Sequence, residues 1–396
     1  MAAISGLSLT QISAAANALV PEERDNTNGV LYKKNDPQWV KSLYERGVPT
    51  VYAKSRNELR YIGMPVGGIN AGGVYLGGDG RLWLWDIFND TCEGVEPKIV
   101  KWQQRSIRSR DGACYVEPAQ NIRPLEQGFA LRFEYNGKTT VKYLRAADWD
   151  EILFEAGYPV GTVRYIDRSL PVETTLHAYS PFIPLNEDES GLPATILSFS
   201  FKNTGISPVK ISVTGWLENK TGIRSAYEML GNYSRETLCR RNNRTVAEKD
   251  FIAVDESLVL LSEQAEEMKT RPDFGTMCIA ALRPDAKACA AVDLDNPDEL
   301  FDFVSIKELD KPVQEPLIGA VQSDMELPAG ASLSRDFVIS WYFPNLKIYD
   351  NIKDTGRYYQ NRFSSALAVA QYIQQNFERL SSQTLLWAAT WKDSTL

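Results

Sequence analysis

Residues 129–144 read FALRFEYNGKTTVKYL, and this stretch decides the class of fold. Apolar residues occupy every second position from Phe129 to Tyr135, Asn136-Gly137 follows, and a second run extends from Thr139 to Leu144. Successive side chains of a strand point to opposite faces, so a period of two predicts strands. Asn-Gly accepts the positive φ angles of a two-residue turn, so the stretch predicts a β-hairpin.

The same pattern recurs along much of the chain. Gly77-Gly-Asp-Gly80 predicts a turn before Leu82-Trp-Leu-Trp85, where alternation places Trp83 and Trp85 on one face. Other short apolar or alternating runs are Leu197 to Phe201, Val209 to Val213, Leu258 to Leu261 and Phe337 to Tyr342. Many short strands without interleaved helices favour a β-sandwich or barrel. We expect a mainly β fold, with a large β-sandwich domain over residues 51–350.

The pattern changes near the C-terminal end. Apolar residues fall at spacings of three and four between about Ser364 and Leu380, which predicts an amphipathic helix. A further helical piece is expected from Thr384 to Trp391, rich in Leu, Ala and Trp. This apolar segment either docks on the sandwich or leads into another domain. We assign residues 351–396 to a helical linker and the start of that domain.

The length and composition of the chain limit the classes of function that it can have. The chain has 396 residues, enough for two or three domains, with 43% hydrophobic and 24% charged residues, so it is expected to fold as a globular protein. A formal charge of -8 argues against a nucleic-acid partner, which requires a basic surface. The 42 aromatic residues, 9 of them Trp, favour strands and also suit stacking on sugars.

The sequence contains few residues in patterns that bind metals or cofactors. His177 is the only histidine, which excludes sites with two imidazoles, and a structural role is expected for it. No C-x-x-C pair occurs among Cys92, Cys114, Cys239, Cys278 and Cys289, so buried thiols are expected. Asp293, Asp295 and Asp298 fit a calcium loop poorly because Pro297 is the fifth residue and no glycine is sixth. No metal, phosphate loop or cofactor is predicted.

The N-terminal residues resemble an export signal. Residues 1–18 are uncharged, apolar and end in Ala16-Asn-Ala18, like a cleavage site, but they lack a basic start. We interpret them as the remnant of an export signal or a flexible leader, followed by an extension over residues 19–50. No later stretch has the 18 apolar residues of a membrane span. An extracytoplasmic location, periplasmic or secreted, is expected, and a cytoplasmic one stays open.

Several motifs carry a family resemblance. The chain contains Tyr158-Pro-Val160, Val163-Arg-Tyr165, Pro171-Val-Glu173, HAYSPFIPLN at 177–186 and SGLPA at 190–194. Supporting matches are GMPVGGINAGG at 63–73, WYFPN at 341–345, NFE at 376–378, and Trp391 with DSTL at 393–396. Together they resemble the N-terminal domain of glycoside hydrolase family 116, which includes the bile-acid β-glucosidase, or non-lysosomal glucosylceramidase.

The resemblance implies a β-sandwich that packs through a helical linker on a C-terminal (α/α)6 barrel, which hydrolyses β-glucosides with retention. The nucleophile and the acid/base of the family belong to that barrel, so no catalytic residue is assigned in this chain. The resemblance therefore predicts a non-catalytic first half of a β-glucosidase or glucosylceramidase, a fragment or truncated form. Its implied partners are the barrel and, through it, a β-glucoside or glucosylated lipid.

Five residues are candidates for the rim of the sugar site or for the domain interface: Trp83, Trp85, Asp86, Trp387 and Trp391. Aromatic rings beside an acid suit the apolar face and the hydroxyls of a glucoside, although packing in the core is the favoured explanation for the rings. The acidic run Glu187-Asp-Glu189 is interpreted as a solvated loop. Two alternatives stay open: a stand-alone carbohydrate-binding or assembly module, and a small hydrolase that uses carboxylates of sandwich loops.

Overall fold

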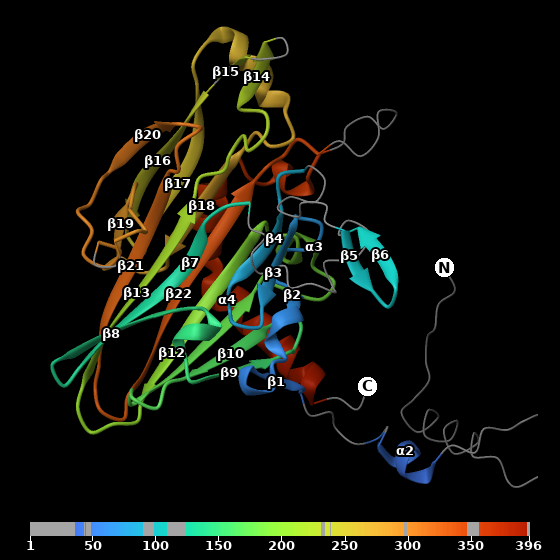
Figure 1. The fold of residues 1–396 in the computed structure, drawn as a ribbon, viewed down its shortest axis with the longest axis vertical. Coiled ribbons are helices and arrows are strands. Elements are labelled where there is room, and N and C mark those ends of the chain that lie inside the picture. The colour runs from blue at the N-terminus through green and yellow to red at the C-terminus, as the bar shows by residue number, and fades with distance from the viewer. Residues whose placement is uncertain are drawn as a thin grey trace, which may run out of the picture. The chain divides into compact units, whose positions relative to one another are not determined.

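Two antiparallel sheets pack face to face in this computed structural model (Figure 1). The structure describes residues 36–42, 44, 49–89, 99–108, 124–230, 234–237, 239–296, 299–346 and 356–393. The chain divides into two units, residues 47–394 and residues 1–46 with 395–396. The described part of the smaller unit includes the short helix α2 (Pro37–Ser42). The predicted leader at residues 1–18 lies outside the described residues.

The larger sheet has ten strands. In spatial order they are β1 (Val51–Ala53), β9 (Glu151–Glu155), β10 (Gly161–Ile166), β11 (Val172–Tyr179), β12 (Ala194–Asn203), β22 (Ser332–Tyr342), β18 (Thr276–Ala281), β17 (Phe251–Leu260), β16 (Cys239–Glu248) and β20 (Glu308–Pro312). The smaller sheet has five strands in the order β19 (Lys287–Cys289), β21 (Ile318–Leu327), β13 (Val209–Glu218), β7 (Gln127–Tyr135) and β8 (Lys138–Tyr143). The prediction of a mainly β sandwich is confirmed.

Smaller elements surround the sandwich. Three short sheets are formed by β2 (Gly63–Pro65), β3 (Gly73–Gly77) and β4 (Leu82–Asp86); by β5 (Ile99–Trp102) and β6 (Arg105–Arg108); and by β14 (Tyr227–Leu230) and β15 (Ser234–Thr237). The helical elements of the larger unit are α3 (Glu187–Ser190), α4 (Ala366–Lys392), and the 3-10 turns η1 (Lys54–Arg56), η2 (Leu59–Tyr61), η6 (Ala146–Asp148), η7 (Glu263–Thr270) and η8 (Tyr358–Asn361). Among the described residues, no helix is long and apolar enough to cross a membrane.

The predicted hairpin joins β7 to β8. Asn136 and Gly137 both have positive φ, 51° and 73°, and Tyr135 pairs with Lys138 across the turn. These are the angles that a tight two-residue turn between twisted strands requires. Phe129 of β7 then reaches the larger sheet, where its ring centre lies 5.2 Å from those of both Phe199 and Phe337. The hairpin thereby supplies one aromatic anchor that joins the two sheets.

The C-terminal helix α4 covers the outer face of the larger sheet (Figure 1). Its apolar stripe is buried as predicted, with Val369, Ala370 and Ile373 fully inaccessible. The Ser365 hydroxyl caps the first turn by accepting a hydrogen bond from the Ala368 amide at 3.1 Å. The prediction of two separate helical pieces is wrong, because the helix continues without a break through Ser381. Buried contacts of the middle turns with the sheet explain this continuity.

We expect Ile373→Ala to lower the free energy of unfolding by about 2–5 kcal/mol, because it leaves a cavity between α4 and the sheet. The exposed Gln375→Ala on the same helix is the matched control and should change it by less than about 0.5 kcal/mol. Urea unfolding of the 396-residue chain measures both. Equal, small effects would show that α4 is not part of the cooperative fold.

A carboxyl group is buried at one end of the sandwich. Glu256 of β17 is fully inaccessible, and neither of its carboxyl oxygens has a hydrogen-bond partner among the described residues. Burial raises the pKa of Glu256 well above its ordinary value; the charges of Glu218 and Asp255 add to the increase, and Arg241 opposes it. Glu256 is therefore protonated in the folded protein at pH values where the unfolded chain has lost this proton.

This difference predicts a pH-dependent stability. Because the folded state holds the proton more tightly, the contribution of Glu256 is fully present below the ordinary pKa of about 4.3 and is lost as pH rises above it. Glu256→Gln keeps a neutral group of the same shape, so it should become progressively more stable than the wild type from pH 5 to pH 8. Urea unfolding across this range measures the gap; the exposed Glu173→Gln is the control. A gap that is constant with pH would contradict the prediction.

Candidate functional site

The C-terminal half of α4 is fixed to the sandwich by three polar contacts. The Tyr179 hydroxyl donates to Ser381 Oγ at 2.8 Å, and the Phe182 amide donates to Thr384 Oγ1 at 3.0 Å. At the end of the helix, Lys392 Nζ lies 2.5 Å from Glu155 Oε1. Tyr179 is the last residue of β11 and Phe182 comes shortly after it, so the motif-bearing segment at the end of this strand is the one that receives the helix.

An aromatic strip runs along this anchored half of the helix. We define it as Tyr158, Phe182, Trp387 and Trp391, whose successive ring centres are 5.5, 6.1 and 6.0 Å apart. Tyr158 and Trp391 are about half exposed, at 47% and 52%. The neighbouring Leu385 and Leu386 expose 44% and 66% of their surfaces, whereas Thr384 and Ala388 are buried against the sheet. The strip therefore packs the end of the helix against the sandwich and leaves Tyr158 and Trp391 partly open to solvent.

The structure separates Trp83 from Trp85. Leu84 has a φ of 53°, and the pairing of β3 with β4 shifts register between Gly73 and Tyr75. This β-bulge reverses the alternation. Trp85 is fully buried in the core, whereas half-buried Trp83 packs edge-on against Tyr75 with ring centres 5.4 Å apart. The prediction that the two rings share a face is wrong, and the Trp85 ring has no exposed surface for stacking on a sugar.

Of the other candidates, Asp86 is half-buried beside Trp83 at the end of β4, and Trp387 and Trp391 belong to the aromatic strip. Trp83 and Asp86 come from a different small sheet, so the structure does not unite the five candidates in one site. For these four residues, a role at a substrate rim or a domain interface stays a prediction.

The acidic run at 187–189 is structural. Asn186 caps the short helix α3 by accepting a hydrogen bond from the Glu189 amide at 3.1 Å. Glu189 is buried, and its Oε1 accepts from the Tyr372 hydroxyl at 2.6 Å and from Arg379 at 2.9 Å, both on α4. The interpretation as a solvated loop is therefore wrong for Glu189, because a helix distant in sequence covers it.

His177 and the described cysteines are embedded in the sheets. The ring of His177 lies 3.0 Å from Thr162 Oγ1 across the β10–β11 pair. Burial lowers its pKa, the charge of Lys392 lowers it further and that of Glu155 opposes, so the ring is neutral near pH 7. Cys239, Cys278 and Cys289 are buried free thiols, as expected.

Other predicted positions give no ligand set. Asp293 accepts a hydrogen bond from the Asp295 amide at 2.9 Å, and Asp298, Cys92 and Cys114 lie outside the described residues. In the described ranges, no three His, Cys, Asp or Glu side chains are arranged to hold a metal ion.

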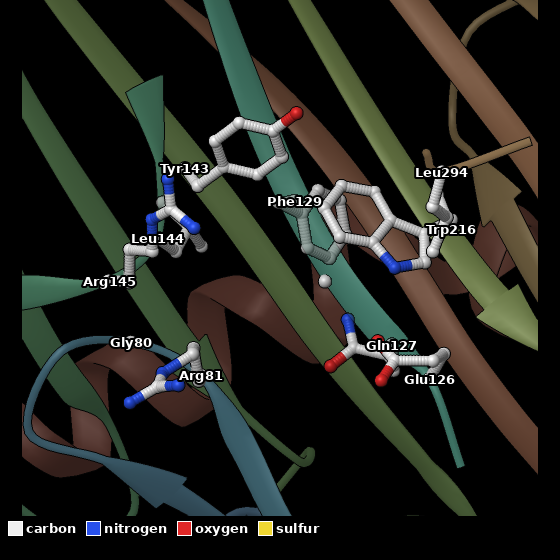
Figure 2. A pocket seen from close by; sticks show the side chains of 11 residues that line it. Gly80, Arg81, Glu126, Gln127, Phe129, Tyr143, Leu144, Arg145, Trp216 and Leu294 are labelled. Carbon is white, nitrogen blue, oxygen red and sulfur yellow. The ribbon is translucent and has the colours of Figure 1, made fainter. Parts of the chain in front are cut away.

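A cavity of about 250 Å³ lies at the ends of β7, β8 and β13, where Phe129 and Leu144 of the core meet Trp216 and Tyr143 of the outer face of the smaller sheet (Figure 2). Trp216 of β13 forms one wall and packs near Tyr143 of β8, with ring centres 6.1 Å apart. Arg81 reaches the cavity from the turn before β4. The full lining is Gly80, Arg81, Glu126, Gln127, Gly128, Phe129, Tyr143, Leu144, Arg145, Trp216 and Leu294.

Two arginines at the cavity are held in place by neighbouring carboxylates. Arg81 lies 2.7 Å from Asp79, which is nearly inaccessible, and Arg145 lies 2.6 Å from Asp148. The Arg145 guanidinium also covers the Tyr143 ring at 4.8 Å from its centre. Burial raises the pKa of the Tyr143 hydroxyl, so it is a neutral donor near pH 7. The cavity thus presents oriented donors beside aromatic surface.

Analysis of the sequence missed this cavity, because its residues come from segments far apart in the chain. One local signal exists. Gly128 pairs with Trp216 across β7 and β13, and a β-carbon at Gly128 would lie 2.3 Å from the indole ring. Glycine is thus required for the indole to lie across the neighbouring strand, but this signal is readable only once the register of the two strands is known.

The architecture defines the class: an antiparallel β-sandwich domain with a helix packed on one sheet and an apolar strip along that helix. The sequence profile described as beta-glucosidase 2, glycosyl-hydrolase family 116 N-term matches residues 63–380. The chain belongs to this family of glycosyl-hydrolase N-terminal domains. This confirms the resemblance that the motifs at 158–194 carry.

No curated protein matches the chain. Among solved structures, a protein described as a kojibiose phosphorylase from the human microbiome is 8% identical, with a TM-score of 0.31; the alignment covers 65% of this chain and 27% of that one. A polysaccharide lyase is 11% identical, with a TM-score of 0.27 and coverages of 76% and 33%. A protein described as an aldose 1-epimerase of Klebsiella pneumoniae is 10% identical, with a TM-score of 0.33 and coverages of 79% and 82%. The chain thus spans about a third or less of the first two proteins.

We expect Trp85→Ala to lower the free energy of unfolding by about 3–5 kcal/mol, because it empties a fully buried volume of the core. Trp83→Ala should cost only about 1–2 kcal/mol, since that ring is half-buried. Urea unfolding of both variants tests the assignment, and equal losses would contradict the bulge at Leu84.

Proposed function

We propose that this chain is the non-catalytic β-sandwich domain of a family 116-type retaining β-glucosidase or glucosylceramidase. The proposal is based on the family match, because the profile that matches residues 63–380 describes an N-terminal domain. In this proposal the nucleophile and the acid/base, which must lie about 5–5.5 Å apart for retention, belong to a C-terminal (α/α)6 barrel. The sandwich acts as its structural support.

The aromatic strip is the proposed contact with that barrel. Rigid aromatic side chains that are held in place before binding lose little conformational entropy, and aromatic residues are enriched in the buried centre of interfaces. The contacts of Ser381, Thr384 and Lys392 with the sandwich hold the strip in one orientation. Leu385 and Leu386, the exposed leucines that follow Thr384 on the same helix, would also contribute, since docking stabilises by about 25 cal/mol for each Å² of apolar surface that it removes from water.

Leu386→Glu tests this contact in two settings. In the 396-residue chain Leu386 is exposed, so the substitution should shift the midpoint of thermal unfolding by less than about 1 °C. In the native polypeptide from the source organism, a buried and unpaired carboxylate should lower the midpoint by about 3 °C or more. Ile206→Glu, which changes an exposed apolar residue between β12 and β13, is the matched control and should be neutral in both. Equal effects of the two substitutions in the native polypeptide would refute the docking role.

Two further measurements test the wider proposal. The intact mass of the native polypeptide should be well above the 44.5 kDa of this chain, since a barrel has to be present. The 396-residue chain alone should not hydrolyse an aryl β-glucoside, whereas the native polypeptide should. A native mass at or below 44.5 kDa, or turnover by the chain alone, would overturn the assignment.

A further inference from the structure

The cavity beside Trp216 has the features of a built binding site. Trp216 is 7% exposed, and its indole N–H has no hydrogen-bond partner among the described residues. A buried donor without a partner is costly, so it marks a position where a bound group can complete the bonding. In Figure 2 the indole nitrogen lies on the side of the ring that faces Gln127, and both residues line the cavity.

The charges at the cavity favour a neutral ligand. Arg81 and Arg145 are each paired with a carboxylate, Asp79 and Asp148, so neither presents an uncompensated charge to an anion. The remaining charged lining residue is Glu126, whose exposed carboxylate accepts hydrogen bonds and repels anions. The site therefore offers donors and an acceptor with no net positive charge.

The rest of the lining is apolar. Phe129, Tyr143, Leu144 and Leu294 complete the cavity with Trp216. A ligand that fits must carry hydroxyl groups on its edge and C–H surface on its face, and a pyranose ring combines the two. A volume of 250 Å³ corresponds to about eight waters at roughly 30 Å³ each, which is room for one hexose of about a dozen heavy atoms.

We propose that this cavity binds a single neutral sugar ring, with the Trp216 indole N–H donating to a ring hydroxyl and Glu126 accepting from another. The cavity is lined mainly by residues at the ends of β7, β8 and β13 and in the turn before β4, and none of the lining residues belongs to α4 or to the aromatic strip. The proposal therefore does not depend on docking of a barrel. It also places sugar recognition at Trp216 rather than at Trp83 or Trp85.

The indole N–H signals of the ¹⁵N-labelled 396-residue chain test the proposal directly. The chain has nine tryptophans, and the signal missing from Trp216→Phe identifies Trp216. Titration with the neutral methyl β-pyranosides of glucose, galactose, mannose and xylose should shift this signal with a saturating curve for at least one sugar. A dissociation constant of about 1 mM is expected for so few heavy atoms.

Trp83 provides the matched control, because its indole nitrogen is also buried without a partner but lies outside the cavity. Its signal should not move, and Trp83→Phe should keep full affinity by calorimetry. Trp216→Phe should bind the same sugar about five- to tenfold more weakly. Glu126→Gln, which alters an exposed side chain and should not disturb folding, should weaken binding about threefold.

Three results would overturn the proposal. One is the absence of a saturating shift of the Trp216 signal with all four sugars up to 20 mM. Another is equal loss of affinity in Trp83→Phe and Trp216→Phe, which would place the sugar elsewhere. The third is tighter binding of glucuronate than of the neutral sugars, which would show that the arginines select a carboxylate.

Discussion

Burial of the larger sheet on both faces is the constraint on which the rest of the structure depends. The side chains of Leu197 and Phe199 point into the core shared with the smaller sheet, whereas Ile196 of the same strand packs beneath α4. Because the strands carry apolar side chains on both faces, each face needs a cover that excludes water. The sandwich therefore requires the helix as much as the second sheet. In the described part of the chain, two features outside this packing are candidates for function: the outer side of α4 and the cavity at the ends of β7, β8 and β13.

Features set by near neighbours in the chain could be predicted from the sequence. Asn136-Gly137 selects its turn through its own φ angles, and the stripe from Ala366 to Leu380 follows from helical period alone. The motif-rich segment at 177–194 pointed to the family and also receives α4, through Tyr179 and Phe182. The class of fold, the family and the buried face of the helix could therefore be predicted from patterns of residues that are close in sequence.

Features set by distant contacts could not be predicted. The bulge at Leu84 moves Trp85 into the core because β4 must present Leu82 and Trp85 together to the same apolar layer. Glu189 is buried because Tyr372 and Arg379, almost two hundred residues later, supply its hydrogen bonds. The cavity depends on Gly128 lying opposite Trp216, which requires the register of β7 and β13. Strand register is a property of the whole fold, and it decides which tryptophan is available to a ligand.

The placement of the two candidate features has a consequence for how they act together. The strip lies along α4, which packs on the larger sheet, whereas the cavity lies at the ends of β7, β8 and β13, and no residue belongs to both. The proposed sugar and the proposed partner therefore do not compete for the same side chains. Coupling between two sites requires an element whose arrangement both sites bias, and the strip and the cavity share no residue, so we expect the two bindings to be independent in free energy. If both proposals hold, the domain binds a sugar ring and a catalytic partner at the same time.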